Sequence, residues 1–174
     1  ILNGKFHGEG KLFLGNKLYY VGEFENNLFH GNGELFSNYC DYYLGEFSEG
    51  CVTGIGEVKW CNGNKYSGSF RNNLIDGYGT YNLADGSFYN GYHVNGLKSG
   101  LGIYTSVSDE GIKTEFISEL WKDNFLFGKG AIKCESNSFH YSGDIRVFIC
   151  SQLQTYFLPH GTGKLQSKSD VDLY

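Results

Sequence analysis

The residues that could carry chemistry in this sequence are spread singly along it. Three histidines, His7, His30 and His160, each stand directly before a Gly-x-Gly pair. Imidazoles are common metal ligands, but a metal site needs several ligands that converge on one point. The same position holds Asp76 and Ser99 in other segments, so we interpret it as a small polar partner for a turn or a backbone group. We therefore predict no metal site and no bound cofactor.

The sequence shows no recognisable combination of nucleophile, base and orienting acid. Carboxylates occur singly, no Ser or Cys has a neighbouring His with an acid, and no phosphate-binding glycine loop opens a helix. We interpret the many Gly-x-Gly pairs as strand packing. We therefore expect that this chain is not an enzyme.

Composition limits the class of partner. The net charge is -5, from 14 Lys+Arg against 19 Asp+Glu, and the basic residues form no run. This argues against nucleic acid and predicts weak or no binding to membrane lipid, because both surfaces attract clustered Lys and Arg. The sequence contains neither a signal peptide nor a long apolar segment, so we expect a cytoplasmic protein, with association to the cytoskeleton or a membrane left open.

The cysteines are odd in number and lack Cys-x-x-Cys spacing, so we expect reduced, partly buried thiols rather than a disulfide framework. They are Cys40, Cys51, Cys61, Cys134 and Cys150.

The segments that hold these residues repeat every 23 residues. Each half-repeat is about five or six residues long, the turns between them are Asn-Asn, Asn-Gly or Asp-Gly, and no stretch has the 3.6-residue period of a helix. The pattern predicts consecutive β-hairpins. A Tyr-x-Gly element places its glycine at Gly22, Gly45, Gly68 and Gly91, and a Gly-x-Gly element begins at Gly8, Gly31, Gly54, Gly77 and Gly100.

Rings and glycines alternate in register. Tyr66, Gly68 and Phe70 share one face of a strand, and Gly77 and Gly79 share one face of the next. A large ring can lie across a neighbouring strand only where that strand offers glycine, so we predict that both Gly77 and Gly79 lie beneath rings. The residue two positions after each Gly-x-Gly pair is apolar: Leu12, Leu35, Val58, Tyr81, Tyr104, Ile132 and Leu165.

The Tyr-x-Gly-x-Phe element, the asparagine turns and His-Gly-x-Gly at residues 7–10, 30–33 and 160–163 resemble MORN repeats (membrane occupation and recognition nexus). The resemblance covers residues 4–165 in about seven copies. It implies an all-β fold, an elongated single-layer antiparallel sheet of consecutive β-hairpins that serves as a non-catalytic scaffold. We assign residues 1–165 to a MORN-repeat array with an incomplete first repeat and two irregular last ones, and residues 166–174 to a polar tail or linker.

The last repeats depart from the pattern at three places. Ser118 occupies a glycine position, the loop between Gly102 and Gly128 is enlarged, and a largely apolar insertion occupies residues 146–159.

The face opposite the rings carries a second pattern. In repeats two and three it is acidic, with Glu23, Glu46 and Glu57. A single-layer sheet cannot bury both faces by itself, so apolar residues on this face predict a docking surface for a partner. The alternative is that sheet twist or the insertion covers them. The predicted partner-binding residues are Ile55, Tyr78, Tyr92, Leu101 and Ile103.

Together these features predict a scaffold or protein-interaction module within a longer cytoplasmic protein, whose partner is another protein or a second copy of itself in a homodimer. One alternative is a peripheral module that binds anionic phospholipids, which needs a basic strip, whereas the Lys and Arg residues here are scattered. The other, implied by the resemblance, is an accessory domain of a SET methyltransferase or a lipid kinase.

Overall fold

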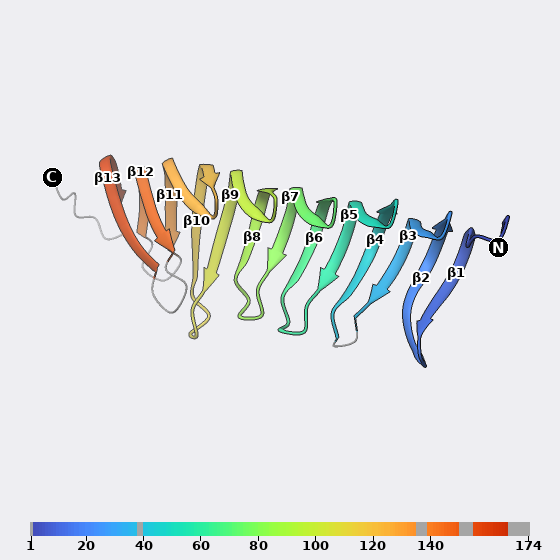
Figure 1. Cartoon of the computed structure of the whole chain (residues 1–174). Coiled ribbons are helices and arrows are strands. Elements are labelled where there is room, and N and C mark those ends of the chain that lie inside the picture. Colours follow the sequence, from blue (N-terminus) through green and yellow to red (C-terminus); the bar gives the residue numbers. More distant parts are fainter. Residues whose placement is uncertain (1, 38–39, 135–138, 150–154, 167–174) are drawn as a thin grey trace. The chain divides into compact units, whose positions relative to one another are not determined.

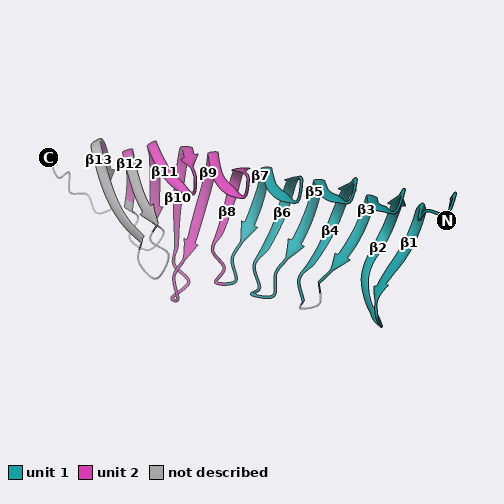
Figure 2. Cartoon of the chain, in the orientation of Figure 1, with its two compact units in different colours: residues 1–84 teal, residues 85–174 magenta. Residues whose placement is uncertain are grey.

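The computed structural model describes residues 2–37, 40–134, 139–149 and 155–166. They belong to two compact units, residues 1–84 and residues 85–174, which Figure 2 shows in different colours. In each unit the strands follow one another in sequence order as an antiparallel sheet of consecutive hairpins (Figure 1). The described residues contain no helix, and none therefore forms a helix that could span a membrane. The predicted all-β class is confirmed.

The strands of unit 1 are β1 (Gly8–Leu14), β2 (Lys17–Glu25), β3 (Leu28–Phe36), β4 (Tyr42–Ser48), β5 (Cys51–Lys59), β6 (Lys65–Arg71) and β7 (Leu74–Asn82). The strands of unit 2 are β8 (Phe88–Val94), β9 (Leu97–Val107), β10 (Lys113–Lys122), β11 (Phe125–Cys134), β12 (Phe139–Ile149) and β13 (Thr155–Gln166).

The regular repeats are built around a tyrosine ring that lies over glycine. Tyr20 on β2 is buried, and a side chain added at Gly33 on β3 would overlap its ring. The ring fits because glycine leaves that space empty, as the sequence predicted. The same relation joins Tyr43 to Gly56, Tyr66 to Gly79, Tyr89 to Gly102 and Tyr141 to Gly163.

Each of these hydroxyl groups donates a hydrogen bond to the backbone carbonyl three residues further on. The strand register shifts at or next to this carbonyl, so the hydroxyl gives it a partner beside a bulge. Burial is the main reason why the pKa values of Tyr20, Tyr43 and Tyr66 rise to about 12, which extends to higher pH the range over which the phenols stay protonated as donors. The acceptors are Glu23 (2.9 Å) and Glu46, Ser69, Tyr92 and Asp144 (each 3.1 Å).

Gly77 does not lie beneath a ring, so that prediction was wrong. A side chain there would meet Cβ of Ser69, on the face opposite the rings. The register of β6 and β7 shifts between the Gly68 pair and the Phe70 pair. Because such a bulge interrupts the alternation of faces, Gly79 stays beneath Tyr66 while Gly77 turns away.

Asparagine turns connect neighbouring hairpins as well as the strands within one hairpin. Asn73 has a φ of 67°, a left-handed conformation that asparagine tolerates better than most residues. Its N–H donates to the carbonyl of Val52 (3.0 Å), and its Oδ1 accepts the N–H of Val52 (2.8 Å). One side chain thus completes a two-bond bridge to the preceding hairpin. Asn27 bonds Phe6 in the same way, and Asn124 bonds Lys98.

Two cysteines form a disulfide, which contradicts the expectation of reduced thiols. The sulfurs of Cys40 and Cys61 are 1.99 Å apart, with a sequence separation of 21. Cys40 follows β3 and Cys61 follows β5, so the two lie in equivalent loops of neighbouring repeats. The period of the chain brings such loops side by side, which the count of cysteines alone did not reveal. Cys51 is a free thiol, Cys134 is not part of this disulfide, and Cys150 lies outside the described residues.

The insertion at residues 146–159 lengthens a hairpin. β12 and β13 pair from Ile145 with Pro159 to Ile149 with Thr155. Residues 150–154 and the side chains of the insertion lie outside the described residues. Of the predicted tail, residues 166–174, Gln166 belongs to β13, and residues 167–174 lie outside the described residues. Whether the insertion covers the apolar face therefore stays a prediction.

Candidate functional site

A pocket lies beside β1, at the edge of the unit 1 sheet. Its volume is about 260 Å³, and its apolar lining consists of Phe6, Leu12 and Phe24 around Gly8 and Gly10. The rings of Phe6 and Phe24 are 5.8 Å apart. Within unit 1, the described residues of β1 pair with β2 alone, so the other edge of the strand has unused hydrogen-bonding groups.

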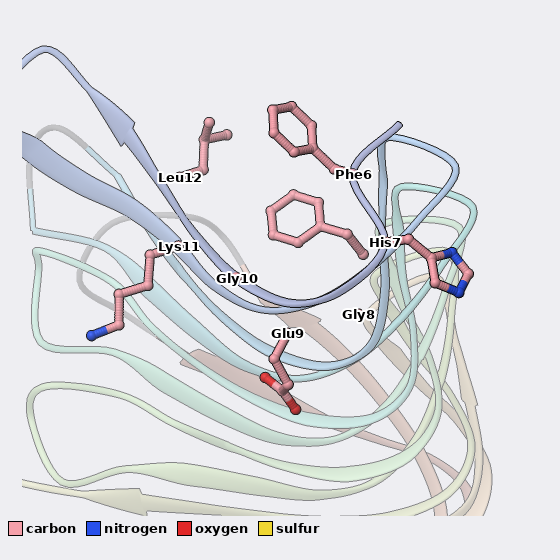
Figure 3. A pocket seen from close by; sticks show the side chains of 8 residues that line it. Phe6, His7, Gly8, Glu9, Gly10, Lys11 and Leu12 are labelled. Atoms are coloured by element: carbon pink, nitrogen blue, oxygen red, sulfur yellow. The ribbon is translucent and has the colours of Figure 1, made fainter. Parts of the chain in front are cut away.

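The two sides of β1 differ in character. Figure 3 shows Phe6 and Leu12 on one side of the strand and the polar side chains of Glu9 and Lys11 on the other. His7, which the sequence analysis singled out, lies at the rim of the pocket and is exposed. The two glycines leave an apolar surface that is open to one side and can accept a flat ring. The pocket does not bring several metal ligands together.

All five predicted partner-binding residues are exposed. Ile55 (59%) and Tyr78 (52%) belong to unit 1, and Tyr92 (49%), Leu101 (58%) and Ile103 (38%) belong to unit 2. They are described here as two patches, one on each unit. In both units the patch lies on the sheet face opposite the tyrosine rings, as the alternation of side chains predicted.

The unit 1 patch has a polar surround. Ile55 faces Ser69 across the pair of β5 and β6. The Glu46 carboxylate, interpreted from sequence as part of a solvated acidic strip, accepts a hydrogen bond from the N–H of Ile55 (2.9 Å), and Glu23 accepts one from Asn32 (3.0 Å). These two carboxylates therefore hold the backbone of the next strand.

The unit 2 patch is more apolar than the sequence indicated. Ile103 faces Ile117 across the pair of β9 and β10. Leu120 and Val94 are exposed as well. Leu120 was not predicted from sequence because the 23-residue period is lost in this repeat, so the residue could not be aligned with earlier copies.

A half-buried lysine was also missed. Lys98 on β9 places its Nζ 4.3 Å from the ring centre of Tyr104, 5.1 Å from Tyr89 and 5.2 Å from Trp121. The rings attract the charged amine through cation–π contacts, but burial lowers its pKa to about 8. Steps of 23 residues could have revealed it, because the preceding repeats have Phe29, Val52 and Ile75 at this position.

Comparison with protein-family models finds the MORN repeat at residues 2–17, 20–40, 66–88 and 89–109. This chain is a MORN-repeat protein. No curated protein matches it. MORN repeats form a generally non-catalytic repeat module that often takes part in protein or membrane interactions.

The unmatched residues between the family-model matches also follow the MORN geometry. In residues 41–65 the Tyr43 ring lies over Gly56, and its hydroxyl donates to the carbonyl of Glu46. After the last match, Phe116 and Ser118 replace the tyrosine and glycine of the MORN pattern. Ser118 still pairs with Gly102 and Gly130, as a glycine of the pattern would. The repeat is therefore more regular in structure than in sequence.

One group of three metal-type ligands occurs among the described residues of these MORN repeats. Cys40, Asp41 and Cys61 offer atoms that lie within 4.8 Å of one another. The two sulfurs are joined, so they present no thiolate to a metal. Asp41 Oδ1 instead accepts the N–H of Cys61 (2.6 Å).

The histidines do not converge in the part of the MORN array that the structure describes. His30 Nδ1 lies 3.3 Å from the carboxylate of Glu25 in its own hairpin, whereas His7 borders the pocket. The side chain of His160 lies outside the described residues.

Proposed function

We propose that this MORN-repeat chain is a non-catalytic scaffold that binds a protein partner through the apolar patches opposite its tyrosine rings. The observation that carries the proposal is the exposure of five large apolar side chains on that face. Within each unit, the described residues of the sheet leave this face uncovered.

The patches have the composition of an interface core. Protein interfaces concentrate their binding energy in a few aromatic anchors, with aliphatic neighbours that exclude water. Tyr78 in unit 1 and Tyr92 in unit 2 are such anchors, each about half exposed. We expect truncation of either tyrosine to alanine to weaken partner binding by about 2 kcal/mol.

A membrane surface is the weaker candidate. Attraction to anionic lipid depends on clustered Lys and Arg, whereas this chain carries a net charge of -5. We expect binding to phosphatidylserine vesicles to disappear at physiological salt, because the remaining charge contacts are screened. Co-sedimentation that persists at physiological salt would put the phospholipid alternative first.

The cytoplasmic location that we expect as part of this proposal has one observation against it. Disulfides are rare in reducing compartments, and Cys40 is joined to Cys61. Thiol labelling in intact cells decides this point, because a reduced pair is labelled and an oxidised pair is not.

The test of the docking patches is a double substitution, Ile55→Glu with Leu101→Glu. Both side chains are more than half exposed, so we expect the variant to stay folded, and the new charges oppose burial in an interface. Leu2→Glu with Phe13→Glu is the matched control, because those side chains are 55% and 53% exposed and lie outside the patches.

Sedimentation velocity measures self-association, and affinity capture from the source cells with reciprocal capture measures other partners. The proposal expects the Ile55 and Leu101 variant to lose an association that the control keeps. Retention of that association by a folded variant contradicts the proposal, and unfolding of the variant would show that the patches are internal core.

A further inference from the structure

We propose that Cys40, Asp41 and Cys61 form a Zn²⁺ site when their disulfide is reduced, so that this place in unit 1 alternates between a disulfide and a zinc-bound pair of thiolates. The three residues lie in the loops that follow β3 and β5. The site is separate from the docking patches, which lie on strands, and it does not depend on the scaffold function proposed above.

The ligand atoms are already grouped closely enough for one zinc ion. The two sulfurs and a carboxylate oxygen of Asp41 lie within 4.8 Å of one another. Zinc binds sulfur at about 2.3 Å and oxygen at about 2.0–2.2 Å, so neighbouring ligand atoms around a tetrahedral ion lie about 3.5–3.8 Å apart. The Cα atoms of Cys40 and Cys61 are 5.3 Å apart, so both side chains can reach one ion after the sulfur–sulfur bond opens.

The next two repeats show that the fold itself needs neither sulfur nor carboxylate at this place. A shift of 23 residues along the chain leads from the three proposed ligands to Gly63, Asn64 and Ala84, and a second shift leads to Gly86, Ser87 and Val107. The arrangement of the loops is kept. A Cβ added at Gly63 would lie 3.1 Å from Cβ of Ala84, and one added at Gly86 would lie 4.0 Å from a methyl group of Val107.

The middle residue of each set forms the same bridge between loops. Its side-chain oxygen accepts a backbone N–H from the loop of the next repeat. The pairs are Asp41 Oδ1 with Cys61 (2.6 Å), Asn64 Oδ1 with Ala84 (3.0 Å) and Ser87 Oγ with Val107 (3.0 Å). A neutral oxygen is therefore sufficient for the bridge. The charge and the second oxygen of Asp41 can serve a cation, and the hydrogen bond to Cys61 fixes the orientation of the carboxylate, as outer contacts of metal ligands do.

The set of donors favours zinc over other common metals. Thiolates bind Zn²⁺, Cu⁺ and iron–sulfur clusters, whereas carboxylates suit harder ions such as Mg²⁺ and Ca²⁺. Two thiolates with one carboxylate match the intermediate softness of Zn²⁺. Three protein ligands leave the fourth tetrahedral position for water, which can reach it because both cysteines are exposed.

Reduction and metal binding balance as two steps. Two molecules of a small thiol give two electrons and two protons to the disulfide between Cys40 and Cys61, and they are oxidised to one disulfide of their own. Zinc then replaces the two thiol protons as it binds, because a metal ligand has to be the thiolate. A small disulfide reverses both steps and releases the ion.

The experiment is a calorimetric titration of Zn²⁺ into the full chain, once oxidised and once reduced with a phosphine. We expect saturable binding of one ion by the reduced chain and no binding by the oxidised chain. Mg²⁺ is the control ion. It should bind neither form, because it prefers octahedral sites made of oxygen ligands.

The first pair of variants tests the sulfur ligands. Cys61→Ser removes one thiolate and should weaken zinc binding by the reduced chain at least a hundredfold. Cys51→Ser is the matched control, because Cys51 is a free thiol outside the cluster, and it should leave the affinity within twofold.

The second pair tests the carboxylate. Asp41→Asn keeps an acceptor for the N–H of Cys61 but loses the charge, so zinc affinity should fall at least tenfold while circular dichroism stays unchanged. Asp85→Asn is the matched control. It makes the same change on a loop aspartate that accepts the N–H of Ser87 (2.8 Å), and the affinity should stay within twofold.

Alkylation with iodoacetamide tests the site without any substitution. In the reduced chain, Zn²⁺ should slow the alkylation of Cys40 and Cys61 at least tenfold, because coordinated sulfur is shielded from the reagent. The rate at Cys51 should not change. Mass spectrometry of the digested chain measures each cysteine separately, so this result stands even if a variant fails to fold.

The proposal is overturned if the reduced chain does not bind zinc or if the oxidised chain binds it equally well. It also fails if Cys61→Ser binds as tightly as the unsubstituted chain, or if Asp41→Asn weakens binding no more than Asp85→Asn. Zinc that slows alkylation at Cys51 as much as at Cys40 and Cys61 would show non-specific binding and would contradict the proposal as well.

Discussion

At the scale of single residues, Phe116 and Ser118 show that two departures from the repeat compensate for each other. In other repeats the tyrosine hydroxyl occupies the space that a side chain on the glycine would need. Phe116 has no hydroxyl, and the buried Ser118 supplies one that donates to the carbonyl of Phe127 (3.3 Å) and accepts the N–H of Leu120 (3.1 Å).

We expect Phe116→Tyr to destabilise the chain by about 1–3 kcal/mol, because the new hydroxyl overpacks against Ser118. Adding Ser118→Gly should recover most of this loss. Urea denaturation of both single variants and the double variant gives the coupling energy. Additive effects would mean that the two positions vary independently.

Lys98 gives the stability of unit 2 a pH dependence of known sign. Its pKa is about 8 in the folded chain and about 10.5 ordinarily, so between these values the unfolded chain binds more protons. Stability should therefore rise as the pH increases from 7 to 9.5. The window stops below pH 10 because the pKa of Tyr104 is raised from 10.0, which gives the opposite trend at higher pH.

Urea midpoints of unit 2 across this range test the effect. Lys98→Leu restores the apolar character that the preceding repeats have at this position and should remove the rise. Lys113→Leu, on an exposed lysine, is the control that should keep it. An equal rise in all three proteins would assign the pH dependence to other groups.

At the scale of elements, the asparagine turns extend strand pairing from one hairpin to the next. Asn73→Gly removes the acceptor of the Val52 N–H but keeps a residue that tolerates positive φ. We expect a loss of about 1 kcal/mol, the usual contribution of one such hydrogen bond. Hydrogen exchange should become faster at the Val52 amide.

Asn72→Gly is the control for this prediction, since Asn72 also has a positive φ (48°) but does not bond Val52. It should leave exchange at Val52 unchanged. Equal effects of the two substitutions would show that turn flexibility, and not the side-chain bridge, sets the protection of Val52.

The sequence was sufficient to predict the strands and the packing of tyrosine rings on glycine. Both follow from side chains that alternate between the two faces of a strand and recur at a fixed period. Gly77 was mispredicted because a bulge depends on how two strands pair. The sequence of one strand does not show this pairing. To predict Lys98 and the disulfide, equivalent positions of different repeats have to be compared with one another. The five patch residues are exposed, but their role in binding stays a prediction, because it depends on a second molecule.

At the scale of the whole molecule, a chain of hairpins distributes its stability among neighbours. Within each unit, each hairpin contacts the adjacent ones, so a substitution should loosen the structure locally rather than everywhere. The regular hairpins can therefore open one after another from an end. The disulfide interrupts that series in unit 1, because it joins loops that flank β4 and β5.

The disulfide also has a mechanical consequence. When the two ends of unit 1 are pulled apart, each strand can peel away in turn, but the residues between Cys40 and Cys61, a separation of 21, cannot lengthen while the sulfurs stay joined. At about 3.3–3.6 Å per extended residue, the chain length that the disulfide keeps from extending is about 70 Å. Single-molecule stretching should gain this length on addition of a reductant, and Cys40→Ser should show it from the start. The oxidation state of one pair of side chains thus sets how far this part of the chain can be drawn out under tension.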